Sequence, residues 1–118
     1  MNITGGQAIV EFLKRNDITE VFGMAGHGNL AFLDSFIDSH INFYSVPHEQ
    51  IAVHAADAYF RIKNKISVVT TTVGPGSTNT VTALADALLD SSAVLLICGG
   101  VPSFFTGKDA LQELGIHN

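Results

Sequence analysis

The sequence predicts an α/β fold, in which helices cover both faces of a doubly wound parallel sheet. Helix-like and strand-like segments alternate along most of the chain with short links, and such alternation produces parallel strands joined by right-handed crossovers. The expected strands at residues 66–72 and 93–98 contain no charged residue, and the second is entirely apolar, as is typical of strands covered on both faces. A hydrophobic fraction of 47% in 118 residues is enough for the core of one domain.

The first helix is expected to begin at Thr4, because Thr4 and Gln7 have the spacing of a capping box. Asn29 is placed to cap the second helix. Apolar residues at helical spacing predict the inner faces of these helices as Ala8, Ile9, Phe12 and Leu13 in the first and Leu30, Leu33, Phe36 and Ile37 in the second. The other expected elements are a helix end at 16–17, a strand at 20–24, a turn at 25–28, a strand at 41–46, a helix at roughly 48–63, a strand at 66–72, a helix at roughly 77–90, a strand at 93–98 and a weak helix at 109–114.

Composition excludes several classes of protein. The net charge of -5 and the lack of any Lys/Arg cluster argue against a nucleic-acid partner. We expect neither a signal peptide nor a membrane span, because no apolar segment follows a basic start and none approaches about 18 residues. The lone Cys98 excludes an intramolecular disulfide, fits a reducing, cytoplasmic compartment, and is expected to be buried in its apolar run. Because only 14% of residues are charged, we expect another subunit or further chain to cover part of the surface.

Two strand-to-helix turns suggest a small-molecule site. Glu49 opens the helix after the strand at 41–46, and Gly74-Pro75-Gly76 follows the strand at 66–72. Both turns fall at the carboxyl edge of the parallel sheet, where open α/β folds bind ligands. Taken alone, an acid in a first helical turn often only complements the helix dipole, and a G-P-G turn is often an ordinary connection. Their combination favours a site in which a carboxylate faces glycine backbone.

Other interpretations of the same residues are weaker. Gly26-His27-Gly28-Asn29-Leu30-Ala31 matches a dinucleotide fingerprint, but Glu49 lies inside a helix rather than at a strand end, and a complete helix precedes the first strand. His48, His54 and Glu49 lack the spacing of metal ligands. Asp86 and Asp90 lie one helical turn apart, which is more typical of a solvated face than of an acid/base pair. The motifs of serine hydrolases and P-loop enzymes are missing from the sequence.

Linked motifs along nearly the whole chain resemble one family. The segments concerned are V-F-G-x-x-G at 21–26, H-E-Q at 48–50, H-A-A-D-x-Y-x-R at 54–61, T-x-G-P-G-x-x-N at 72–79, A-D-A-x-x-D-S at 85–91, G-x-V-P at 99–102 and Q-E at 112–113. Their order and spacing resemble the N-terminal pyrimidine-binding domain of thiamine diphosphate enzymes of the acetolactate synthase type. The turn at 26–29 is similar to the variant in relatives such as trihydroxycyclohexanedione hydrolase. The resemblance implies that residues 1–118 are a fragment of such a domain.

The resemblance also implies roles for single residues. Glu49 would hydrogen-bond N1′ of the cofactor's aminopyrimidine and so favour the imino tautomer that removes the thiazolium C2 proton. By the same resemblance, the residues around the pyrimidine would be Ala25, Gly26, Thr72, Gly74, Gly76 and Asn79. His27 and Gln112 would face the substrate, a 2-oxo acid that is decarboxylated or joined to a second molecule.

The family's second cofactor module is absent from the 118 residues. That module carries a G-D-G segment followed by an Asn, and it holds magnesium and the diphosphate. Because the family's sites form between two subunits, we expect the partner to be a second copy or a chain with the diphosphate module. Residues 114–118 do not form a natural end for such a sheet and its helices, and we therefore expect the chain to be a piece of a longer protein. Alone, the chain is not expected to turn over substrate. The alternative is a non-catalytic α/β domain, kept as a pairing partner or left as a truncated remnant.

Overall fold

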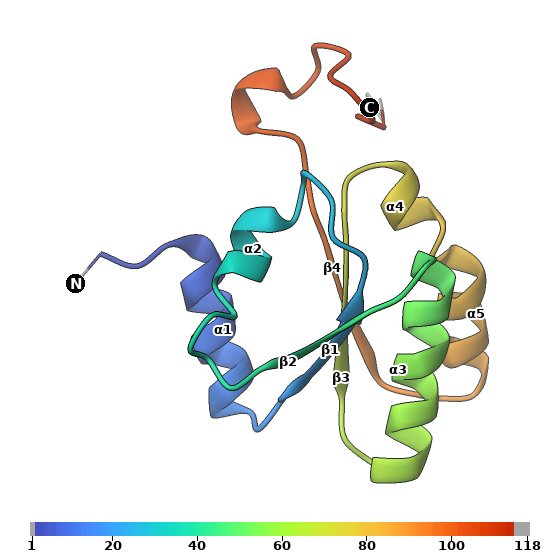
Figure 1. Ribbon diagram of the computed structural model, residues 1–118. Helices are drawn as coiled ribbons and strands as arrows, with labels where there is room; N and C mark the ends of the chain where they lie inside the picture. Colours follow the sequence, from blue (N-terminus) through green and yellow to red (C-terminus); the bar gives the residue numbers. More distant parts are fainter. Residues whose placement is uncertain (1, 115–118) are drawn as a thin grey trace.

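A computed structural model describes residues 2–114 and contains a four-stranded, fully parallel sheet (Figure 1). The order of the strands across the sheet is β2-β1-β3-β4. The bounds of the strands are Glu20–Gly23 for β1, Asn42–Ser45 for β2, Ser67–Thr71 for β3 and Val94–Cys98 for β4. The bounds of the helices are Gly5–Arg15 for α1, Leu30–Asp34 for α2, Glu49–Lys63 for α3, Pro75–Thr78 for α4, Val81–Leu89 for α5 and Ser103–Phe105 for the 3₁₀ helix η1. The predicted doubly wound fold is confirmed.

The two faces of the sheet are covered by different helices (Figure 1). Successive side chains of a strand point to opposite faces, so Val68 joins a cluster with residues of α1 and the α2 segment, whereas Val69 joins a cluster with α3 and α5. The first cluster consists of Val10, Leu13, Ile18, Val21, Phe32, Phe36, Ile41 and Val68. The second consists of Ala52, Val53, Ala56, Val69 and Ala83. Its small residues let α3 and α5 lie close to the strands and to each other.

The carboxyl ends of all four strands meet at one edge of the sheet, because every pairing is parallel. The turn after β1, the start of α3 and the turn after β3 are therefore brought together at this edge. Between residues 2 and 114, no helix has both the length and the apolar character that crossing a membrane requires.

The helix starts are largely as predicted. Thr4 Oγ1 accepts a hydrogen bond from the Gln7 backbone N–H at 3.1 Å, and Gln7 Oε1 accepts from the Thr4 N–H at 2.9 Å, so the capping box is confirmed. Helix α1 ends at Arg15 with Asn16 as its C-cap, and α3 begins within one residue of the expected position.

The helix predicted at 77–90 is instead two helices, α4 and α5. The Thr80 hydroxyl donates to the Ser77 carbonyl at 2.6 Å, and the Thr80 N–H also bonds Ser77 O. This local bonding competes with the regular i→i−4 pattern and separates the two helices. The weak helix expected at 109–114 is also wrong, because the Glu113 carboxylate accepts from the backbone N–H groups of Gly107 and Ala110 and folds this segment into turns.

Several predicted inner positions are exposed. Helix α2 ends at Asp34, so its periodicity does not extend to Ile37, and the structure buries Phe32 and Phe36 while Leu30 and Ile37 are 56% and 69% exposed. In α1, Val10 and Leu13 are buried and Phe12 is 57% exposed. Ala8 and Cys98 were also expected to be buried, but both are exposed. Strand β4 is only partly covered, because it lies at the edge of the described sheet. The expectation about the chain end falls mostly on residues 115–118, outside the described residues.

An ion-pair cluster joins α3 to the end of α5. The Arg61 guanidinium donates from Nε and Nη2 to the two Asp57 carboxylate oxygens, each at 2.8 Å, and it also bonds Asp90 just after α5. Asp57 is only 6% exposed. The Arg61 hydrogen bonds hold the pKa of Asp57 below its ordinary value of 3.8. The charged form of Asp57 is therefore favoured by folding.

We predict that Asp57→Asn lowers the free energy of unfolding at neutral pH by roughly 1–2 kcal/mol, because it removes charge-assisted hydrogen bonds. Since the folded-state pKa of Asp57 lies below the unfolded value near 3.8, its contribution is complete above that value and is lost as the pH falls below it. Urea denaturation of both proteins from pH 7 to pH 3 measures the difference, which should shrink only below about pH 4. The control is Asp34→Asn at an exposed position, and a difference that is constant with pH would contradict the prediction.

Candidate functional site

Glu49 is buried at the first position of α3, with 5% of its surface exposed. The preceding residue, His48, has an extended backbone and caps the helix by accepting the Gln50 N–H on its Nδ1 at 3.2 Å. Because His48 provides the side-chain cap, the Glu49 carboxylate is not needed for it. The Glu49 carboxylate instead points toward the neighbouring segment after β3.

One oxygen of the Glu49 carboxylate is held by Asn79. The Asn79 side-chain amide, between α4 and α5, donates from Nδ2 to Glu49 Oε2 at 3.0 Å. The other oxygen, Oε1, accepts no hydrogen bond from any residue in the described part of the chain. A Cβ added to Gly76 would lie 3.3 Å from Oε1. The carboxylate thus has one fixed oxygen and one that lies against glycine backbone.

The turn after β3 requires glycine at two positions. Gly74 has a φ of +50°, which favours glycine, and a Cβ there would collide with the carbonyl oxygen of Gln112. A Cβ at Gly76 would lie 2.8 Å from the Thr72 Cγ2 methyl, closer than side chains pack. Pro75 occupies the first position of the short helix α4, where its missing N–H is not needed. The turn is consequently compact and leaves bare backbone beside Glu49.

The turn after β1 is held by a buried side chain, that of Asn29. Its Oδ1 accepts from the Gly26 N–H at 2.9 Å, and its Nδ2 donates to the Met24 carbonyl at 3.0 Å and to Thr70 Oγ1 at 3.3 Å. Asn29 occupies the predicted N-cap position of α2, but its side chain makes no cap hydrogen bond to that helix. Sequence reasoning missed the role of Asn29 in holding this turn; the available signal was a polar residue with several hydrogen-bonding atoms directly after a glycine-rich turn.

Thr72 joins the two turns. Its Oγ1 accepts from the Gly28 N–H at 3.1 Å, and a Cβ at Gly26 would collide with the Thr72 side chain. The same side chain limits the space at Gly76. Both glycine turns therefore pack against one threonine.

The structure brings most of the predicted site residues together. Glu49, Thr72, Gly76 and Asn79 form a contiguous group, and Gly26 lies against Thr72. The backbone of Gln112 covers Gly74, while its side chain is exposed. Ala25 and His27 are exposed on the first turn, and no hydrogen bond joins either of them to Glu49.

A second group of acids lies on the outer side of α3 and α5. The oxygens of Asp57, Asp86 and Asp90 lie within 4.8 Å of one another. Arg61 already bonds Asp57 and Asp90, and His54 Nδ1 is 3.7 Å from Asp86. These partners explain the cluster as ion pairing between the two helices.

Comparison with known proteins identifies the family. The model of the thiamine pyrophosphate enzyme N-terminal TPP binding domain matches residues 3–118. An acetolactate synthase from Arthrospira platensis is 44% identical over 118 residues, which cover 97% of this chain and 20% of that protein. A probable acetolactate synthase large subunit from Methanocaldococcus jannaschii is 40% identical (93% of this chain, 19% of that protein), and the mitochondrial acetolactate synthase catalytic subunit of Saccharomyces cerevisiae is 39% identical (98% and 17%).

The chain spans about a fifth of the length of these relatives. The match confirms the resemblance seen in the linked motifs, and the parallel sheet with helices on both faces is consistent with it. The chain belongs to the thiamine pyrophosphate enzyme family and corresponds to its N-terminal cofactor-binding domain.

Proposed function

We propose that this chain, residues 1–118, forms the pyrimidine-binding side of a thiamine diphosphate site in an enzyme that acts on 2-oxo acids. In this proposal Glu49 exchanges a proton with the ring nitrogen N1′. The observation that supports it best is a buried carboxylate with one oxygen held by Asn79 and the other directed at the backbone of Gly76. The class of substrate rests on the relatives named acetolactate synthases.

The residues fit an aminopyrimidine by their chemistry. Such a ring is flat, with hydrogen-bonding nitrogens on its edge, so its site needs a polar group in the ring plane and thin walls beside the ring faces. Glu49 offers the polar group. Gly26 and Gly76 add no side chains here, and Thr72 already occupies much of the space that a Cβ would need at either position.

The hydrogen bond from Asn79 supports a distinct role for each oxygen of Glu49. An amide NH₂ is only a donor, so Oε2 acts as an acceptor toward Asn79. The proton that Glu49 gives or takes is therefore carried by Oε1. Glu49 as a whole is only 5% exposed, which limits the access of water to its carboxylate.

The cofactor, when bound, supplies a nucleophilic carbon for attack on the carbonyl of a 2-oxo acid, in decarboxylation or carboligation. Gly26, Thr72, Gly74, Gly76 and Asn79 would hold the ring, and Ala25 would lie beside it. His27 and Gln112, exposed at the same edge, would face the substrate. Magnesium and the diphosphate would be held by another module, either in a second copy within a homodimer or in a separate chain.

We predict that Glu49→Gln abolishes most of the activity of a chimera in which residues 1–118 replace the matched fifth of the Arthrospira platensis enzyme. Glutamine keeps the shape and can accept a hydrogen bond but cannot exchange a proton. The expected loss in kcat is about 100-fold or more, the scale of a lost general acid/base. Steady-state acetolactate formation measures it.

Glu11→Gln is the matched control, because Glu11 is an exposed acid on α1 that pairs with Lys14, and this variant should keep full activity. A fully active Glu49→Gln chimera would refute the role of Glu49 and favour the alternative of a non-catalytic domain.

We further predict that Gly76→Ala weakens binding of thiamine diphosphate to the chimera by roughly tenfold or more, since the added methyl occupies space between Thr72 and Glu49. Gly5→Ala is the control, as a Cβ at Gly5 meets no atom within 4 Å. Isothermal titration calorimetry in the presence of magnesium measures both variants. Equal affinities for Gly76→Ala and Gly5→Ala would show that the turn does not border the cofactor.

A further inference from the structure

The side-chain amide of Asn29 is committed entirely to the turn after β1. Only 3% of Asn29 is exposed. Its Nδ2 donates to the Met24 carbonyl and to Thr70 Oγ1, and its Oδ1 accepts from the Gly26 N–H. An amide NH₂ group carries two hydrogens, and both are used inside the protein. Asn29 therefore has no side-chain hydrogen left to donate to a ligand, and its effect on a ligand passes through the turn.

These bonds fix the backbone on both sides of Gly26. The Asn29 side chain holds the Gly26 N–H, and the Gly26 carbonyl accepts from the Asn29 backbone N–H at 3.1 Å. Met24 is also bonded through both backbone groups, because its N–H donates to the Thr70 carbonyl at 3.4 Å and its carbonyl accepts from Asn29 Nδ2. Residues 24–26 are thereby attached to β3, an inner strand of the sheet.

Gly28 is fixed by a second set of contacts. Its N–H donates to Thr72 Oγ1 at 3.1 Å. A Cβ at Gly28 would lie 2.5 Å from Val73 Cγ1, and a Cβ at Gly99 would lie 2.5 Å from the Gly28 carbonyl oxygen. The Gly28 backbone is therefore packed against the segments that follow β3 and β4.

His27 lies between these two fixed glycines, and it is exposed. Because both neighbours are packed against the sheet, the backbone of His27 has little freedom and its side chain stays on the outer side of the turn. A side chain on a fixed turn loses less conformational entropy on contact with a ligand than one on a mobile loop. The turn thus holds the His27 imidazole ready at the carboxyl edge of the sheet, where open α/β folds bind ligands.

We propose that Asn29 is a positioning residue, which fixes the turn at 24–28 and so holds the His27 imidazole where the 2-oxo acid binds. Asn29 acts through His27 and does not itself touch the substrate. The place of the substrate rests on the proposed function, whereas the fixing of the turn does not. Neither part depends on proton exchange by Glu49.

The alternative is that Asn29 only stabilises the fold, and Ser39 provides the matched comparison. Ser39 is 5% exposed, and its Oγ donates to the Phe36 carbonyl at 2.6 Å and accepts from the Ile41 N–H at 3.2 Å. It precedes β2 and so lies at the amino edge of the sheet, opposite the glycine turns. Ser39→Ala thus removes buried bonds between a side chain and the backbone, as Asn29→Ala does, but leaves the turn at 24–28 untouched.

Amide hydrogen exchange in the 118-residue chain, followed by NMR, tests whether Asn29 holds the turn. We expect Asn29→Ala to speed exchange of the Gly28 amide at least about tenfold, although that amide bonds Thr72 and not Asn29. Ser39→Ala should leave Gly28 exchange unchanged, and urea denaturation compares the global stability of the two variants. Equal Gly28 exchange in variants of equal stability would overturn the proposal. If Asn29→Ala does not fold, Asn29→Asp replaces it, because aspartate keeps the size and the acceptor but cannot donate to the Met24 carbonyl.

A double-mutant cycle in the chimera with the Arthrospira platensis enzyme tests whether the fixed turn acts through His27. At saturating thiamine diphosphate, we expect Asn29→Ala and His27→Ala each to raise the KM for pyruvate about fivefold or more, and the double variant to raise it no further than His27→Ala. Ser39→Ala should keep the parent KM. An unchanged KM in Asn29→Ala, or increases that multiply in the double variant, would overturn the proposal. Failure of the Glu49 role appears instead as a fully active Glu49→Gln chimera, in which this comparison of KM values can still be made.

Discussion

The burial of the Glu49 carboxylate is the constraint on which the site depends. A charged group removed from water needs hydrogen bonds, and in the described residues Glu49 has one such bond, from Asn79, thirty positions later in the sequence. The parallel sheet makes that bond possible, because it brings the start of α3 and the turn after β3 to the same edge. The break between α4 and α5 then places Asn79 over the carboxylate instead of in a continuous helix.

The two glycine turns are joined by small polar side chains, and their glycines permit the close approach. Thr72 bonds the first turn through Gly28 and touches the second at Gly76. Asn29 ties the first turn to Thr70 of β3. These bonds cross between segments more than forty residues apart, so that the position of Gly26 relative to Glu49 is set by the central strands. Such a framework suits a rigid aromatic ligand, whose binding requires walls that are already in place.

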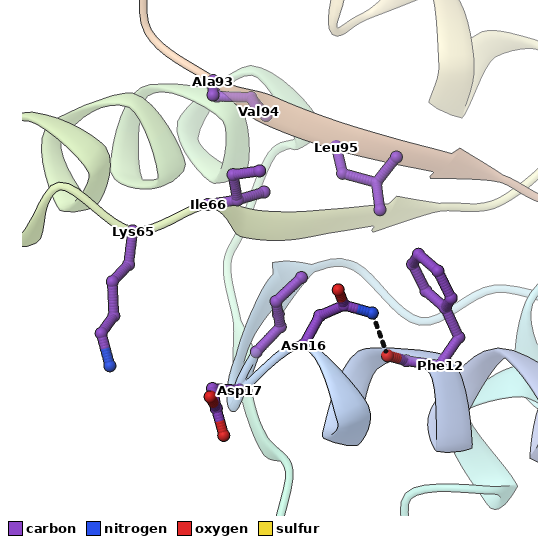
Figure 2. Close-up of a pocket in the computed structure, with 9 residues that line it drawn as sticks. Phe12, Asn16, Asp17, Lys65, Ile66, Ala93, Val94 and Leu95 are labelled. Carbon is purple, nitrogen blue, oxygen red and sulfur yellow. Dashed lines mark hydrogen bonds between the residues drawn. The ribbon is translucent and has the colours of Figure 1, made fainter.

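Much of this arrangement follows from local sequence signals. The parallel sheet, the capping box at Thr4 and the grouping of Glu49 with the G-P-G turn depend on spacing and periodicity, and the structure contains all three. Asn29 and Thr80 were not predictable in the same way, because their side chains bond backbone or distant groups whose positions only the tertiary structure fixes. Phe12 fits an inner stripe by periodicity but is 57% exposed and lines an open hollow between α1 and β4 (Figure 2). Periodicity shows which face of a helix is apolar, but it does not show whether other residues of the same chain cover that face.

The central claim, that Glu49 Oε1 meets the pyrimidine ring, is tested most directly by a crystal structure of the chimera with thiamine diphosphate and magnesium. The account predicts Oε1 within about 2.6–3.2 Å of ring N1′, with the Asn79 hydrogen bond to Oε2 retained. A pyrimidine bound elsewhere, or one whose N1′ faces a different side chain while Glu49 stays bonded only to Asn79, would contradict it.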